Sequence, residues 1–317
     1  MPWYSGNMHC HTSNSDGRSN PQEATAYYQS IGMDFLAITD HNHLTSLEEY
    51  GNLDEDKFIG IPSSEYSGKR ACHVVGFDLA ENVRPVDNQE DWSVRDILAD
   101  GMNQILASGG VPILCHPGFQ WAYDHETILE LERATHFEVV NMHPGCNSRP
   151  VPCLSYGEEV WDKVLSAGKR CFGTVSDDGH FYGTASEFGA PPLHIPLAGT
   201  GWNVVKAAEL TPSAIRDAFA KGRFYGSTGI DLAYYQVTYE DIRVGVTLKK
   251  KEQVIIEFIG ENGKLLDLQS ASAGRYKFKG DEKYVRVRVS DTMGGFAFTQ
   301  PVFLDDLAKT VEWTSQP

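Results

Sequence analysis

Cysteine, basic residues and long apolar runs are all scarce in this chain. Its 317 residues include six cysteines, whose spacing fits neither a zinc-finger pattern nor a compact disulfide scaffold. We therefore expect reduced thiols that pack as small apolar side chains, which favours a cytoplasmic location. Cys10, Cys72 and Cys115 each stand beside a histidine, and on a strand they are expected to face away from it, towards the covering helices.

Membrane and export signals are also missing. No run of about 18 uninterrupted apolar residues occurs, so no membrane-spanning helix is expected. The first residues lack a basic segment followed by an apolar one, which argues against a signal peptide. Neither a Gly-x-Ser-x-Gly motif nor a Gly-x-x-x-x-Gly-Lys-Ser/Thr loop is present, so serine-nucleophile and P-loop chemistry are not indicated.

Basic residues are outnumbered by acidic ones. The chain has 27 Lys and Arg against 43 Asp and Glu, which gives a formal net charge of -16. An acidic surface repels a phosphate backbone, and no basic, aromatic-rich strip offsets that repulsion. Nucleic acid is therefore not favoured as a partner, whereas a small anion bound beside metal ions is compatible with this charge.

What the chain does contain is a series of short apolar runs flanked by ionisable residues. These expected strands lie at 35–39, 59–62, 73–76, 111–115, 137–140 and 171–175. Helices are expected between them at 20–31, 92–108, 124–133, 158–167 and 211–222. Strands that alternate with helices predict an α/β fold with a largely parallel sheet, open or closed into a barrel. Polar residues at strand C-termini are where such barrels carry their active sites.

His9-Cys10-His11 begins the series of ionisable residues. Two histidines at i and i+2 on a strand point to the same side of it. Asp16 follows in a loop, and Asp40-His41 ends the next apolar run. Imidazole nitrogens and carboxylate oxygens are ligands of divalent metals such as Mn²⁺, Fe²⁺ and Zn²⁺. Because the pattern recurs at successive strand ends, it predicts a metal centre.

The order of these residues resembles that of the PHP (polymerase and histidinol phosphatase) family. The matching residues are His9-x-His11, Asp16, Asp40-His41, Glu65, His73, His116-Pro117 and Asp178-x-His180. The match covers roughly residues 5–185, and it implies a distorted (β/α)7 barrel over residues 1–229 with a site for two or three divalent metals. The Asp177-Asp178 doublet and residues 222–229 further resemble the subgroup that contains the carbaryl hydrolases.

The resemblance implies a role for individual residues. The expected metal ligands are His9, His11, Asp16, His41, Glu65, His73, His116, Asp178 and His180. Glu65 is expected to bridge two metals, and it is assigned to catalysis together with Asp40 and His180. We expect Asp40 to orient a ligand or to move a proton. His143 is expected either to face the substrate or to cap its strand end.

Several other charged residues lie near the ligand-bearing loops. Arginine grips phosphate oxygens with a bidentate fork, so Arg18, Arg70 and Arg149 are candidate substrate-binding residues. The remaining histidines have no identifiable partners, and we expect them to have surface or packing roles. They are His43, His125, His136 and His194.

Beyond residue 229 the helical signals give way to period-two alternation. Apolar and polar residues alternate at 235–239, 242–246, 254–258 and 284–289, and Glu261-Asn262-Gly263 is a hairpin-turn signal. Residues 230–317 are therefore expected to form a small antiparallel β-sandwich without ligands of its own, acting as a scaffold or an interface.

Taken together, these features predict a metal-dependent phosphoesterase that acts on a small phosphorylated substrate through a metal-activated water. Two alternatives stay open. The same metal site would suit a carbamate or carboxyl-ester hydrolase, and a non-catalytic metal-binding module is also compatible with the fold. In the second case eroded ligands are expected, whereas all nine positions are present here.

Overall fold

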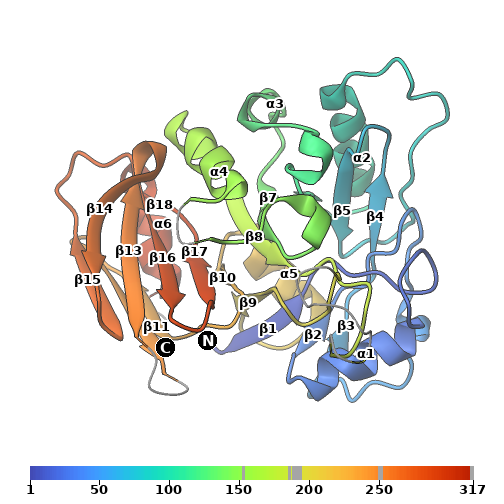
Figure 1. Ribbon diagram of the computed structural model, residues 1–317, viewed down its shortest axis with the longest axis horizontal. Coiled ribbons are helices and arrows are strands. Elements are labelled where there is room, and N and C mark those ends of the chain that lie inside the picture. Colours follow the sequence, from blue (N-terminus) through green and yellow to red (C-terminus); the bar gives the residue numbers. More distant parts are fainter. Residues whose placement is uncertain (152–153, 185–186, 188–194, 249–252, 315–317) are drawn as a thin grey trace.

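The structure is a computed structural model that describes residues 1–151, 154–184, 187, 195–248 and 253–314. Figure 1 shows an α/β part, coloured blue to yellow, beside a mainly β part, coloured orange and red, that also contains a helix near the C-terminus. Along the described chain, no helix is both long and apolar enough to cross a membrane.

The helices begin where the sequence places capping residues. In the described residues the α-helices are α1 (Pro21–Ser30), α2 (Val94–Ala107), α3 (His125–Glu130), α4 (Tyr156–Ser166), α5 (Pro212–Ala220) and α6 (Leu307–Thr314). At the start of α1 the Asn20 side chain accepts a hydrogen bond from the Glu23 amide, and Glu23 accepts one from the Asn20 amide. Helix α6 was not expected from the sequence, and α3 ends before the predicted residue 133.

The strands of the α/β part are short, and they fall into two groups. They are β1 (Trp3–Asn7), β2 (Phe35–Leu36), β3 (Ile59–Gly60), β4 (Ser63–Ser67), β5 (His73–Phe77), β6 (Val111–Leu114), β7 (His136–Asn141), β8 (Phe172–Ser176), β9 (Trp202–Lys206) and β10 (Phe224–Ser227). One sheet has the order β4-β5-β6-β7-β8, and β10-β9-β1-β2-β3 belong to another. Parallel pairing joins β1 to β2 to β3 and β6 to β7 to β8, whereas β5 and β9 run antiparallel to their neighbours.

The mixed α/β fold is therefore confirmed, but a closed seven-stranded barrel is not shown. Isolated bridges, such as His41 with Glu65 and Thr45 with Ser63, link the two sheets in place of a continuous ladder. A core containing Ile59, Val75 and Phe219 draws residues from both sheets and from α5. This core lies between the sheets, and helices α2, α3 and α4 cover the outer side of β5–β8 around Trp161.

The C-terminal part forms two antiparallel sheets. Its strands are β11 (Asp231–Val237), β12 (Asp241–Thr247), β13 (Val254–Gly260), β14 (Lys264–Gln269), β15 (Ala273–Lys277), β16 (Tyr284–Asp291), β17 (Phe296–Thr299) and β18 (Val302–Phe303). Strands β11-β12-β15 form one sheet. The other sheet is continuous with the α/β part, because β17 pairs with β10 across the expected boundary at residue 229. The expected hairpin turn joins β13 to β14, with Asn262 at a φ of 54°.

A buried ion network joins the two parts. Arg286 of β16 donates two hydrogen bonds to the Asp162 carboxylate of α4, at 2.8 and 2.6 Å. Its third nitrogen lies 3.4 Å from Glu158, and the Tyr284 hydroxyl donates to Asp162 at 2.9 Å. Arg286 and Glu158 are completely buried. Such a pair is costly to break, since removing one partner leaves an uncompensated charge inside the protein.

Candidate metal centre

All nine expected ligands lie close together, and all but His9 line one small pocket. We expected His9 and His11 to lie on a strand, but they lie just beyond the end of β1. Cys10 between them forms an isolated parallel bridge with Gly179, and in such an extended segment the side chains of residues i and i+2 point to the same side. His41 follows β2, His116 follows β6 and Asp178 follows β8. The C-terminal ends of strands from both sheets thus meet at the site, as parallel-strand architectures favour.

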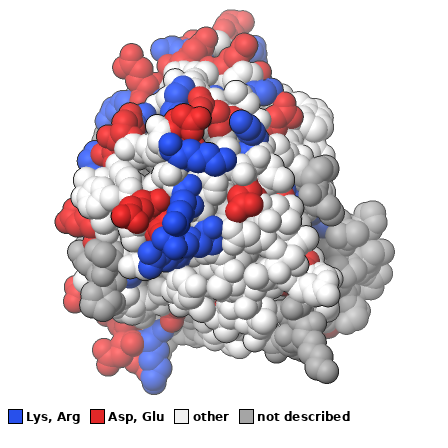
Figure 2. Space-filling model, turned by 90° about the vertical axis from the view of Figure 1, so that its left-hand side faces the viewer, with Lys and Arg blue, Asp and Glu red and all other residues white. Residues whose placement is uncertain are grey.

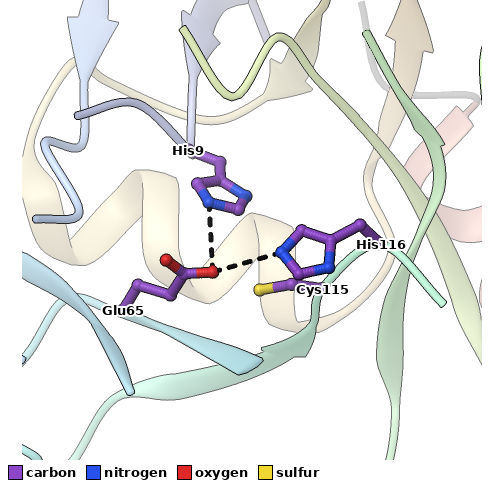
Figure 3. A group of neighbouring side chains, drawn as sticks. All are labelled: His9, Glu65, Cys115 and His116. Carbon is purple, nitrogen blue, oxygen red and sulfur yellow. Dashed lines mark ion pairs between the residues drawn. The ribbon is translucent and has the colours of Figure 1, made fainter. Parts of the chain in front are cut away.

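Glu65 lies at the centre of this pocket and is completely buried. Its Oε1 lies 3.4 Å from Nε2 of His9 and 3.4 Å from Nε2 of His116, as Figure 3 shows. Nδ1 of His73 lies 3.1 Å from the same oxygen, and Nδ1 of His41 lies 2.6 Å from Oε2. One carboxylate therefore faces histidines that come from four different segments of the chain.

A second group surrounds Asp16 at the outer side of the pocket. Its carboxylate lies 3.3 Å from Nε2 of His180, 3.6 Å from Nε2 of His41 and 3.8 Å from Nδ1 of His11. The loop that carries Asp16 turns at Gly17, where a Cβ would come within 2.1 Å of the His11 carbonyl oxygen. Glycine is therefore required at this turn to bring Asp16 to the histidines.

A third group links the other two. Nε2 of His11 lies 3.2 Å from Nε2 of His9 and 3.1 Å from Oδ1 of Asp178. His9 lies 3.6 Å from the same Asp178 oxygen. Most separations in the three groups are 3.1–3.8 Å. Ligands about 2.1 Å from one tetrahedral ion lie about 3.4 Å from each other, so these atoms have the spacing of ligands around shared cations.

The polar chemistry of the pocket also fits divalent cations. Oε2 of Glu65 is buried and lies 2.6 Å from Nδ1 of His41 and 3.6 Å from Nε2 of His11. The lining side chains are His11, Asp16, His41, Glu65, His73, His116, Phe119, His143, Cys146, Asp178 and His180. This described lining contains three carboxylates but no lysine or arginine. Buried carboxylates need compensating positive charge, which metal ions would supply.

The carboxylates of the pocket hold their negative charge strongly. Burial raises the pKa of Glu65, but nearby His73, His41 and His9 outweigh it and hold that pKa well below its usual range. Burial lowers the pKa of His41, but Glu65 and Asp16 outweigh it and raise the value to about 10. For His11 burial prevails and lowers the pKa to about 4. These directions favour an ionised Glu65, a protonated His41 and a neutral His11 near neutral pH.

Two of the expected ligands have an unusual backbone conformation. His116 has a φ of 29° and Asp178 a φ of 49°, in the left-handed region that residues with a Cβ rarely adopt. Such strain clusters at functional sites, where the surrounding structure holds it in place. Here it directs both side chains into the pocket as their strands end.

Glu138 of β7 is a site residue that the sequence analysis missed. Its carboxylate accepts a hydrogen bond from the His116 backbone amide at 2.7 Å and one from the Asn141 side-chain amide at 2.9 Å. It also lies 2.7 Å from Nδ1 of His9. Ser176 donates to the same carboxylate. Glu138 is almost fully buried. A lone carboxylate inside the apolar run 137–140 was the available signal.

Asp40 supports the loop that carries Asp16. Its carboxylate accepts hydrogen bonds from the Thr12 amide and hydroxyl, at 2.7 and 2.6 Å. Ser15 and Thr45 donate further bonds at 2.7 and 3.1 Å. Asp40 is buried and does not line the pocket. This placement fits an orienting role, and its direct part in catalysis stays a prediction.

The expected substrate-binding residues are less central. Arg70 donates to the Glu90 carbonyl, Arg149 donates to the Met142 carbonyl, and the Arg18 guanidinium lies over the Phe181 ring. These three arginines do not line the pocket, whereas His143 does. Nδ1 of His143 accepts from the Gly145 amide at 3.0 Å. The substrate-binding roles of all four residues stay predictions.

The cysteines require one correction. The five described cysteines are unpaired and buried, and Cys153 lies outside the described residues. Cys10 and Cys72 pack against α1 and α2 as expected. Cys115 instead belongs to the inner core, and its sulfur lies among ligand atoms of His9, Glu65 and His116 (Figure 3). The expectation assumed that Cys115 and His116 face opposite sides of an extended strand. The backbone leaves the extended conformation at His116, so both side chains lie close to Glu65.

The four remaining histidines lie away from the pocket or outside the described chain. His136 is buried, and its ring stacks on Phe219 with centroids 4.6 Å apart. His43 is partly exposed and lies 3.4 Å from Glu49. Neither they nor His125 lines the pocket, and His194 lies outside the described residues. The packing and surface roles expected for the described three agree with these positions.

Comparison with known proteins identifies similar folds. No protein-family model matches the sequence, and no curated protein matches it. A two-domain protein of Bacteroides vulgatus that contains a predicted PHP-like metal-dependent phosphoesterase aligns with a TM-score of 0.54 at 15% identity. The alignment covers 91% of this chain and 90% of that one. The chain therefore shares a PHP-like fold, whereas similarity to the carbaryl hydrolase subgroup is not confirmed.

Two further structures are more distant. A protein of Bifidobacterium adolescentis proposed to be a metal-dependent phosphoesterase aligns over 57% of this chain and 89% of its own, with 14% identity and a TM-score of 0.40. An amidohydrolase of Chromobacterium violaceum, with bound sulfate and no metal, aligns over 60% of this chain and 93% of its own, with 17% identity and the same TM-score.

Proposed function

We propose that this chain is a metal-dependent hydrolase of a small phosphate ester. The observation that carries the proposal is the grouping of nine histidine and carboxylate side chains. Eight of them line one pocket whose described lining has no basic residue other than histidine. Two or three divalent ions would be held there by the groups around Glu65, around Asp16 and around Asp178. The PHP-like fold supports this proposal. As part of it, we propose that the ligand-bearing strands correspond to the distorted barrel that the family resemblance implies.

The residues of the chain prepare the site for such ions. Glu138 lies against Nδ1 of His9 and would keep the proton there, so that Nε2 faces the pocket as a ligand. Ser67, with its hydroxyl 2.6 Å from Nδ1 of His41, would orient that ring in the same way. The Phe119 ring also lines the pocket, with its centroid 5.2 Å from that of the His116 ring. When bound, the ions would lower the pKa of a coordinated water and hold phosphate oxygens for attack.

The size of the pocket supports a small substrate. Its volume is about 130 Å³, which suits a phosphate group but leaves the rest of an ester outside the histidine cluster. A net charge of -16 disfavours long polyanions. We therefore propose a short phosphomonoester or phosphodiester, with Arg18, Arg70, Arg149 or His143 as further contacts at the rim.

Metal analysis combined with a substrate comparison tests this function. After expression with added Mn²⁺ or Zn²⁺, we expect two or three ions per chain and turnover of 4-nitrophenyl phosphate or its diester. Well under one ion per chain would contradict the metal centre. Two or more ions without turnover of any ester would instead favour the non-catalytic module.

A carbamate or carboxyl-ester hydrolase is the second candidate. The described pocket lining offers no lysine or arginine to neutralise a phosphate, and a neutral carbonyl substrate needs none. Turnover of a 4-nitrophenyl carbamate or acetate well above that of the phosphates would establish this alternative at the same metal centre.

A further inference from the structure

A second cavity lies where the α/β part meets the C-terminal strands. Its volume is about 350 Å³, within the range of small-molecule sites and larger than the metal pocket. Arg170 and Phe172 line it at the start of β8, and Lys221 and Arg223 line it between α5 and β10. The C-terminal part contributes residues of β11, β18 and α6 to the opposite wall.

This cavity is distant from the candidate metal centre. Phe172 begins β8, whereas Asp178 follows its other end. Six residues of extended chain span about 20 Å, so the two sites lie at opposite ends of the same strand. No lining residue is common to them. A ligand in this cavity would therefore leave the metal ligands untouched.

The charge of the cavity is opposite to that of the whole chain. Arg170, Lys221, Arg223 and Lys309 line it together with only two carboxylates, although the net charge of the chain is -16. Arg170 already pairs with Asp305, and Lys309 lies 2.9 Å from Asp306.

The other two cations have no such partners. In the described chain the Lys221 and Arg223 side chains make no hydrogen bond or ion pair. This differs from the outer β layer, where acidic side chains lie beside the basic ones in Figure 2. In the sheet β11-β12-β15, for example, Asp241 pairs with both Arg243 and Arg275.

The shape of the cavity adds an apolar component. Phe172, Tyr235, Phe303 and Trp313 contribute aromatic walls, and the Tyr235 and Trp313 rings lie 6.0 Å apart. Gly222 fixes the turn between the two free cations, because it has a φ of 71° and a Cβ there would come within 2.2 Å of the Phe172 ring. A preformed turn presents both cations at little entropic cost.

We propose that this cavity binds a small organic anion with a flat apolar body, whose phosphate, sulfonate or carboxylate group contacts Lys221 and Arg223. The aromatic walls receive the body, and the two free cations neutralise the charge. Because residues from both parts line the cavity, the ligand also holds them together, and binding stabilises the folded chain. This inference is independent of the proposed hydrolase activity.

Calorimetric titration of the metal-loaded protein with 1-naphthalenesulfonate tests the proposal. We expect one probe per chain, a higher melting temperature with the probe, and affinity about tenfold or more above that for neutral 1-naphthalenemethanol. The double variant Lys221→Ala/Arg223→Ala should lose about tenfold or more in affinity for the sulfonate.

Two controls separate this cavity from other binding. Lys57→Ala/Lys163→Ala removes the same charge at exposed ion pairs and should leave the affinity unchanged. Asp178→Asn alters the metal pocket and should also leave it unchanged. Equal affinity for the neutral probe, unchanged affinity in the Lys221/Arg223 variant, or binding lost in the Asp178 variant would each overturn the proposal.

Discussion

Two buried charged clusters in this chain differ in how their carboxylates are neutralised. In the network between α4 and β16, the Asp162 carboxylate receives two nitrogens of Arg286, a permanent cation. In the described lining of the pocket around Glu65, the only side chains that can carry positive charge are imidazoles. Asp162 and Glu65 are both buried, but only Asp162 is paired with a permanent cation from the described chain.

This difference separates a structural cluster from a binding site. An arginine with two parallel hydrogen bonds satisfies a carboxylate within the chain and leaves no room for another cation. Imidazoles can give up their protons, so their nitrogens are available to metal ions. Mutations should therefore affect the fold in one cluster and metal binding in the other.

Glu65→Gln should have the largest effect, and it should act on function. Loss of the central carboxylate should remove at least one ion per chain and lower turnover about 1,000-fold or more, beyond the about 10- to 100-fold cost of losing a supporting contact. The variant should still fold, since the apolar cores and the Arg286 network do not depend on Glu65. Elemental analysis, ester turnover and urea unfolding measure these outcomes. Near-native turnover would contradict a central role for Glu65.

Arg286→Leu should show the reverse pattern. Asp162 would stay buried without its cation, and Glu158 would keep only Arg288, 3.7 Å away. The free energy of unfolding should therefore fall by about 3–5 kcal/mol. Urea unfolding measures this loss, and the metal content of the folded fraction should stay unchanged. The exposed Arg95→Leu change, next to Asp96, serves as a control with little expected effect. Equal free energies of unfolding for Arg286→Leu and Arg95→Leu would contradict a structural role of the Arg286 network.

The grouping of the expected ligands was largely predictable from the sequence and its family resemblance, whereas the ion network was not. The ligands recur at ends of apolar runs, and strand direction brings those ends together. Arg286 and Asp162 are 124 residues apart, and nothing local marks either as buried. Glu138 was missed because its role depends on contacts with His9 and His116 that only the folded chain creates.

The fold was predicted in outline for a similar reason. Capping residues and apolar periodicity located α1, α2, α4 and α5 within a few residues. The pairing of β10 with β17 joins the two parts into one sheet, and such long-range pairing has no local signal. Cys115 likewise continues the inward alternation of Val111 and Ile113, and the left-handed backbone of His116 turns that histidine to the same side, which the sequence pattern does not reveal.

His136 extends the comparison to a third way of burying an ionisable group, the loss of its charge. Burial lowers its pKa from 6.5 to about 4. Between about pH 4 and pH 6.5, His136 is therefore protonated in the unfolded chain and neutral in the folded chain. The contribution of His136 to the free energy of unfolding should be constant above about pH 6.5. The free energy of unfolding should then fall by about 3 kcal/mol as the pH falls to about 4.

Unfolding measured across this pH range in wild type and His136→Phe tests the sign. The variant should lose this part of the pH dependence, whereas His43→Gln, at an exposed position, should retain it. An identical slope in wild type and His136→Phe would show that other groups govern acid unfolding.

Glu138→Gln should have the smallest effect, and it tests whether a carboxylate near the ions can act without binding them. The glutamine amide can still accept a hydrogen bond from the His116 backbone, so the fold should persist. It no longer provides a negative charge beside Nδ1 of His9, and the imidazole becomes a weaker ligand. We expect metal affinity to fall about 10- to 100-fold, with turnover restored by excess metal. Asn141→Ala removes a neutral contact to the same carboxylate and should cost less. If Glu138→Gln instead abolishes turnover at saturating metal while metal affinity is unchanged, Glu138 acts on the substrate, and the distinction between ligand and support fails at this residue.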